Sequence, residues 1–83
     1  MSYDIIKLEW EFDDPDYFAE VGSYDANIIK MKHRWEWDIS GGGIEGESGR
    51  GYADTVSEAQ NAVQEAFEED VLRYLVEIKE KVV

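Results

Sequence analysis

The sequence predicts a small α+β domain in which three antiparallel strands form a meander and one long C-terminal helix packs across it. Two stretches of the first half alternate apolar and charged residues, which is the period of half-buried strands. Three consecutive glycines follow the second stretch, and the last third of the chain repeats its apolar residues at helical intervals. With 83 residues the chain has room for one hydrophobic core, so we expect a single domain over residues 1–83.

The first strand is expected over residues 4–12. Charged side chains there alternate with apolar ones, so one face of the strand would be buried. The outward series is Lys7, Glu9 and Glu11, and the inward series is Ile6, Leu8, Trp10 and Phe12.

A short helical turn is expected next, between the first and second strands. Asp14, Pro15 and Asp16 stand in the order of an N-cap, a proline at the first helical position and an acid in the first turn. The turn would continue through residues 17–19 and end at Gly22. A short strand over residues 17–21 is the alternative interpretation.

The clearest alternation predicts a long second strand over residues 29–39. Gly41 to Gly43 then allow a turn, and a third strand should start at about Ile44. The outward face of the second strand would carry Lys30, Lys32 and Arg34, paired with acids of the neighbouring strands, Glu9, Glu11, Glu45 and Glu47. The inward face would carry Ile29, Met31, His33, Trp35, Trp37 and Ile39, so that all three tryptophans, Trp10 included, lie in the core.

The C-terminal helix is expected from about Val56 to Lys81. Either Thr55 with Glu58 or Ser57 with Gln60 has the spacing of a capping box. The apolar residues at helical spacing are Ala59, Ala62, Val63, Ala66, Phe67, Val71, Tyr74, Leu75 and Ile78. The sheet face opposite this helix would be exposed to water.

The charge of the chain excludes several functions. Twenty acids against eight bases leave a formal net charge of −12, which repels nucleic acid and anionic membranes and attracts basic surfaces.

There is no cysteine, and His33 is the single histidine, with no base or nucleophile near it in sequence. No apolar stretch approaches the roughly 18 residues of a membrane span. We therefore expect a soluble protein that is not an enzyme and needs no cofactor.

Four acids in the first connection, Asp13, Asp14, Asp16 and Glu20, could bind a hard cation through their oxygens. Their spacing departs from the calcium-loop pattern, which requires ligands at alternate positions, a glycine at the sixth and an acid at the twelfth. We interpret the segment as a capped, solvated turn without a metal site.

The acids that remain without a predicted base are the candidate partner-binding residues. Glu65, Glu68 and Glu69 lie three and four residues apart on the helix, where like charges repel. Such a surface either keeps the protein soluble or presents carboxylates to a basic groove in place of phosphates. The candidates are Asp13, Asp14, Asp16, Glu20, Asp25, Glu65, Glu68, Glu69 and Asp70.

Residues 35–67, WEWDISGGGIEGESGRGYADTVSEAQNAVQEAF, combine an aromatic strand, a glycine turn and the start of a helix. In this respect the chain resembles small acidic phage-encoded inhibitors, which include anti-CRISPR proteins and other DNA mimics. The resemblance implies binding to the basic surface of a nucleic-acid-handling protein, such as a nuclease or a defence complex, in the cytoplasm of a host cell. No binding residue is carried over from that group.

The alternative is a structural or adaptor module that acts through apolar contacts, most simply as a homodimer. An exposed edge strand is another route to pairing. The apolar stripe near the end of the helix is wider than one small sheet requires. It consists of Val71, Leu72, Tyr74, Leu75, Val76 and Ile78.

Overall fold

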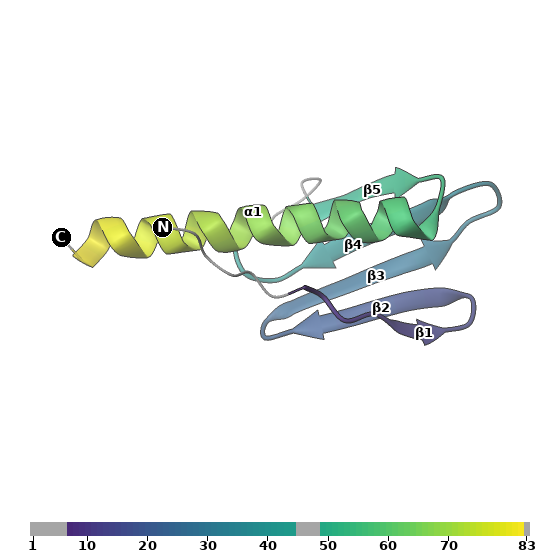
Figure 1. Ribbon diagram of the computed structural model, residues 1–83, viewed down its shortest axis with the longest axis horizontal. Coiled ribbons are helices and arrows are strands. Elements are labelled where there is room, and N and C mark those ends of the chain that lie inside the picture. The colour runs from purple at the N-terminus through teal and green to yellow at the C-terminus, as the bar shows by residue number, and fades with distance from the viewer. Residues whose placement is uncertain (1–6, 45–48, 83) are drawn as a thin grey trace.

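The computed structural model describes residues 7–44 and 49–82, with side chains of the helix described as far as residue 73. A five-stranded antiparallel sheet, ordered β1-β2-β3-β4-β5, carries one helix on one face (Figure 1). The α+β class and the long C-terminal helix are confirmed, but the sheet has five strands where the sequence analysis expected three. The elements are β1 (Glu11–Asp13), β2 (Asp16–Val21), β3 (Tyr24–Lys30), β4 (Trp35–Ser40), β5 (Arg50–Ala53) and α1 (Val56–Val82).

The segment expected to form a helical turn is the strand β2. It pairs with β1 on one side and β3 on the other, so its backbone groups are bonded in both directions. Ala19 is buried on the helix side, and Glu20 next to it is exposed on the other side. The helical turn is therefore wrong, and the alternative interpretation of a strand over residues 17–21 is confirmed.

The long second strand is in fact two strands joined by the turn at residues 31–34. Lys30 and Trp35 face each other at the end of β3 and β4, and the Met31 N–H donates to the Arg34 carbonyl oxygen over 2.9 Å. The adjacent residues Ile28 and Ile29 explain the error, because either one could start the alternation. Ile28 is 0% exposed whereas Ile29 is 38% exposed, so β3 has the opposite phase from the one expected.

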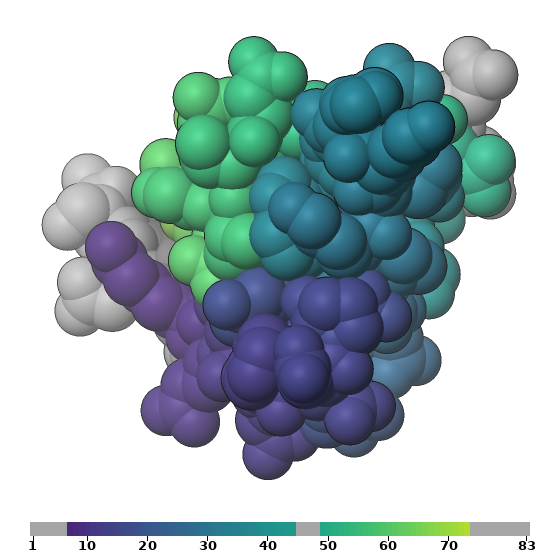
Figure 2. All heavy atoms as spheres, turned by 90° about the vertical axis from the view of Figure 1, so that its right-hand side faces the viewer, coloured from purple at the N-terminus to yellow at the C-terminus, as the bar shows by residue number. Residues whose placement is uncertain are grey.

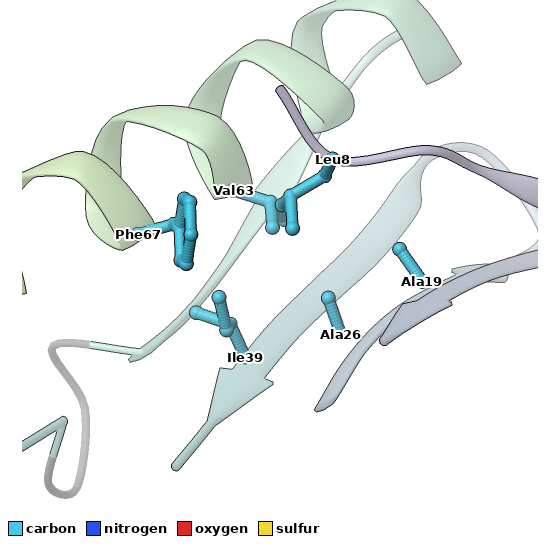
Figure 3. Close-up of a cluster of buried hydrophobic side chains, with 6 residues drawn as sticks. All are labelled: Leu8, Ala19, Ala26, Ile39, Val63 and Phe67. Atoms are coloured by element: carbon cyan, nitrogen blue, oxygen red, sulfur yellow. The ribbon is translucent and has the colours of Figure 1, made fainter. Parts of the chain in front are cut away.

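The expected first strand is reduced to the three residues of β1. Residues 7–10 leave the sheet, and residues 4–6 of the expected strand lie outside the described part of the chain. Leu8 is buried with Val63 in the core cluster (Figure 3). Its N–H donates to Gln64 Oε1 over 3.0 Å. Among the described residues α1 contacts β3, β4 and β5 but neither β1 nor β2. Leu8 therefore covers the part of the sheet that the helix leaves open.

The core lies between the helix-side face of the sheet and α1 (Figure 3). Trp10 and Trp37 are half-buried and pack against this core, while half-buried Trp35 instead lies 6.1 Å from the ring of Tyr17. The tryptophans thus border the core and do not fill it. The buried cluster consists of Leu8, Ala19, Ala26, Ile39, Val63 and Phe67.

The start of α1 follows one of the two expected caps. Thr55 Oγ1 accepts the Glu58 N–H over 3.1 Å, and Glu58 Oε2 accepts the Asp54 N–H over 3.3 Å, while Ser57 lies inside the helix. The helix has 27 residues, about 40 Å in length, and it extends beyond the end of the sheet (Figure 1). After the glycine turn, Ile44 bridges Gly41, and Glu45 and Glu47 lie outside the described residues.

Candidate functional site

The face of the sheet opposite α1 is acidic and uncovered by any described element. Successive side chains of a strand point to opposite faces, and burial of Ala26, Ile28 and Ile39 identifies the helix side. The strand register then places the acids of β1, β2 and β3 together on the other side. We call this surface the acidic sheet face; it consists of Glu11, Asp13, Asp16, Glu20 and Asp25.

Two pairs of like charges lie directly opposite each other on this face. Asp13 pairs with Asp16, and Glu20 pairs with Asp25, in the register of the sheet. Like charges in such positions are destabilising, by roughly 0.2–1 kcal/mol for each pair. Asp16 also has a structural role, because its Oδ1 accepts the Lys30 N–H over 2.9 Å. Glu20 and Asp25 are the second pair from the exposed turn at residues 22–23, next to Val21 and Tyr24, and the register places no base beside them.

The β4 and β5 half of the same face is balanced in charge. Asp38 lies opposite Arg50 in the register and accepts a hydrogen bond from Asn27 Nδ2 over 3.3 Å. Glu36 lies opposite Tyr52 and shares with it, Arg50 and Gly51 a hollow of about 420 Å³. The excess of negative charge is therefore concentrated on β1, β2 and β3.

A second hollow, of about 230 Å³, lies at the edge of the acidic sheet face. It forms where the residues that precede β1 separate from β2 and run towards the helix. Three carboxylates and a phenylalanine ring suit a cationic side chain with a long apolar stem, which can lay its stem on the ring and its charge among the oxygens. The hollow is lined by Glu9, Glu11, Phe18, Ala19 and Glu20.

The bases do not neutralise these acids in the way the sequence analysis expected. Lys30 lies on the helix side of the sheet, with Nζ 4.6 Å from the ring centroid of Trp35. The Arg34 guanidinium lies 3.6 Å from the ring centroid of Tyr52, and Lys32 is exposed in the turn between β3 and β4. The positive charges thus gather at that turn, away from Glu20 and Asp25.

The helix acids form a separate surface. Glu65 and Glu69 are exposed on α1, which covers the opposite face of the sheet (Figure 1). Glu68 is half-buried, and its Oε2 accepts a hydrogen bond from Gln64 Nε2 over 2.8 Å. One flat partner surface cannot contact both Glu20 on the sheet and Glu65 on the helix, so the candidate acids do not act as one row.

Asp70 belongs to neither surface. It is 4% exposed, and its Oδ2 accepts the Tyr24 hydroxyl over 2.6 Å and the Gly43 N–H over 2.9 Å. Its candidate role in partner binding is replaced by a structural one. The burial of Asp70 could have been predicted from helical spacing. Asp70 follows the buried Val63 and Phe67 by seven and three residues, which places all three on the same face of the helix.

Asp14, the remaining candidate, is exposed in the turn between β1 and β2. Within the described part of the chain no three acidic or histidine side chains are arranged to hold a metal ion. None of the described helical residues form a segment apolar and long enough to cross a membrane.

Comparisons with protein-family models, curated proteins and solved structures gave no match.

Proposed function

We propose that the protein is an inhibitor that covers a basic, nucleic-acid-binding surface of a partner protein with its acidic sheet face. The observation that carries the proposal is the uncovered sheet face on which Glu20 and Asp25 oppose each other without a base between them. Carboxylates that serve only solubility do not need to face each other across a strand pair, since dispersed charges avoid that repulsion. Carboxylates that replace phosphates must be dense.

The geometry of a sheet supports such density. Same-face side chains lie about 7 Å apart along a strand, and neighbouring strands lie about 5 Å apart. A groove that binds nucleic acid is lined by Lys and Arg side chains aimed at phosphates. Several of those cations would meet carboxylates of β1, β2 and β3 at once, and the hollow at Glu9 and Glu20 would receive one of them.

A capture experiment with DNA competition tests this function. The tagged protein is incubated with a cell lysate at low salt, and the bound proteins are then challenged with duplex DNA or with an uncharged polymer at the same mass concentration. We expect DNA to release the bound partner and the uncharged polymer to leave it bound, because the protein and DNA would occupy the same surface. A partner that stays bound at saturating DNA would exclude competition for a nucleic-acid surface.

A second candidate function is homodimerisation through α1. Leu72 is 41% exposed, and the helix continues beyond the sheet (Figure 1). Sedimentation at high protein concentration tests this candidate. A dimer in the wild type that becomes a monomer in Leu72→Glu would support it, and a monomeric wild type would remove it. Val71, another member of the expected stripe, is half-buried and packs against the core. The other members, Tyr74, Leu75, Val76 and Ile78, lie outside the described side chains.

A further inference from the structure

Phe18 lies among the acids of the acidic sheet face. The strand register places it opposite Glu11 in β1 and Asn27 in β3, and Glu20 follows two residues later on the same side of β2. Phe18 is half-buried, but it is not among the described residues that form the core cluster or pack against it. A large apolar ring surrounded by polar groups on a water-facing surface commonly marks the centre of a protein interface.

The hollow of about 230 Å³ beside Phe18 lies at the edge of β2. Its lining includes Ala19, which points to the helix side, as well as Phe18 and Glu20, which point to the other side. A space bordered from both sides lies next to the backbone of the strand. β1 pairs with β2 only at residues 16–18, whereas β3 pairs with β2 as far as residue 21. Among the described residues the edge of β2 is therefore open from Ala19 onward.

This site can be reached from the acidic sheet face. Figure 2 looks onto the end of the molecule that carries the β1–β2 and β3–β4 turns. α1, in green, lies on one side of the sheet, and the residues that precede β1, in purple, run towards that same side. The other side of β1 and β2 is uncovered by any described element. A partner bound to the acidic sheet face therefore reaches both Phe18 and the hollow.

The lining of the hollow is suited to a guanidinium group. Glu9, Glu11 and Glu20 contribute carboxylates to it, and no base lines it. The face of the Phe18 ring also attracts a cation. Arginine is better suited than lysine, because its planar group is weakly hydrated, stacks on rings and binds carboxylates through two parallel hydrogen bonds.

The same side of the sheet contains a contact of this type within the chain itself. Tyr52 lies opposite Glu36 in the register, and the Arg34 guanidinium lies 3.6 Å from the centroid of the Tyr52 ring. Phe18 likewise lies opposite an acid, Glu11. Within the described part of the chain, however, no cation lies over the Phe18 ring. A cation of a partner can take that place.

We propose that Phe18 and the hollow beside it receive one arginine side chain of the partner, with the guanidinium group against the ring and its N–H groups directed to the carboxylates. This inference rests on the proposed function and adds that the basic surface presents arginine, and not only lysine, at the open edge of β2. The acidic sheet face attracts any cation, whereas the ring discriminates between the two.

Two labelled peptides of equal charge, an arginine nonapeptide and a lysine nonapeptide, test the site. Their dissociation constants are measured by fluorescence anisotropy at low salt for the wild type and three variants. In Phe18→Leu, which keeps an apolar side chain but loses the ring, we expect the preference for the arginine peptide to fall about threefold. Phe18→Tyr keeps a ring and should keep the preference. Phe12→Leu is the matched control and should not change it, because Phe12 lies in the same hairpin but on the helix side, opposite Tyr17.

A second measurement uses the wild type, so it does not depend on the folding of any variant. In nuclear magnetic resonance spectra, the arginine peptide should shift the ring proton signals of Phe18 and leave those of Phe12 in place. The lysine peptide should shift the Phe18 signals less. Phe18 signals that do not move when the arginine peptide binds would overturn the site, and so would an unchanged preference in folded Phe18→Leu.

The proposed function fails separately from this site. It fails if Glu20→Lys combined with Asp25→Lys leaves the affinity for the lysine peptide unchanged, whatever the ring of Phe18 does. If neither peptide binds the wild type at low salt, the site and the proposed function both fail. The unfolding temperature of each variant is measured as the control for folding.

Discussion

The hydroxyl of Tyr24 donates a hydrogen bond of 2.6 Å to Oδ2 of Asp70, and the same oxygen accepts the Gly43 N–H. These contacts join β3, the glycine turn and α1, and they bring together Tyr24 and Asp70, which are 46 residues apart in sequence. A buried carboxylate is costly unless donors compensate for its lost hydration, and here two donors do so. The contact therefore locks the helix to the sheet.

Replacement of Asp70 by alanine should destabilise the fold. The Tyr24 hydroxyl and the Gly43 N–H would lose a charged acceptor in a buried place, which we expect to lower the free energy of unfolding by about 2–4 kcal/mol. Urea unfolding measures the change. Glu69→Ala, one residue away and exposed, is the matched control and should change the free energy by less than about 0.5 kcal/mol. Equal effects of the two substitutions would show that the Asp70 contacts do not stabilise the protein.

Two glycines in different turns, Gly22 between β2 and β3 and Gly42 in the glycine turn, should respond differently to an added side chain. Gly22 and Gly42 both have positive φ, 57° and 54°, so alanine strains the backbone at each by about 1–2 kcal/mol. At Gly22 an added Cβ meets nothing within 4 Å, whereas at Gly42 it would lie 2.5 Å from Asp70 Oδ2 and also meet the Tyr24 hydroxyl. Thermal unfolding should therefore show a larger loss for Gly42→Ala than for Gly22→Ala. The reverse order would contradict the packing of the turn against Tyr24 and Asp70.

Residues 7–10 should contribute to stability although they form no strand. Leu8 is 8% exposed in the core, whereas Leu72 is 41% exposed. We expect Leu8→Ala to lower the free energy of unfolding by about 2–4 kcal/mol and Leu72→Ala to change it by less than about 0.5 kcal/mol in a monomer. Chemical unfolding of both variants measures the difference. A neutral Leu8→Ala would mean that the N-terminal segment does not cover the sheet.

The cap of α1 can be assigned by two alanine substitutions. Thr55 bonds the Glu58 N–H, whereas Ser57 lies in the first turn and is exposed. Loss of a threonine cap should lower the free energy of unfolding by about 1 kcal/mol, and Ser57→Ala should be neutral or slightly stabilising, since alanine favours helix. Unfolding curves that rank the two variants the other way would move the cap to Ser57.

The helix could be predicted from sequence because its period, its cap and its length all agree. The strand phases could not, since Ile28 and Ile29 are adjacent apolar residues and only one faces the core. The four residues of the β3–β4 turn contain no glycine or proline that would mark it. The two turns on either side of β2 were assigned to a helix start and a helix end, because Pro15 and Gly22 serve both purposes.

The candidate site was predictable in composition but not in arrangement. Sequence identifies Asp13, Asp16, Glu20 and Asp25 as acids without a base, yet their convergence depends on the pairing of β1, β2 and β3. Asp70 is indistinguishable from Glu69 by charge alone, and only the position of Phe67 one turn earlier marks its inward face. Phe12 was expected in the core, but it is exposed, because among the described residues α1 contacts neither β1 nor β2.

The central claim is that position, and not total charge, makes the acidic sheet face a binding surface. Two double variants test it, because Glu20→Lys with Asp25→Lys on the sheet and Glu65→Lys with Glu69→Lys on the helix change the net charge equally. The affinity of each for the partner captured by the wild type is measured over a series of salt concentrations.

We expect the wild-type affinity to fall steeply as salt screens the charges. The sheet variant should lose at least about a hundredfold in affinity at low salt, as expected for several charged contacts, while the helix variant stays within a few fold of the wild type. Equal losses in the two variants, or a wild-type affinity independent of salt, would contradict the claim and leave the acidity as a property of the whole surface.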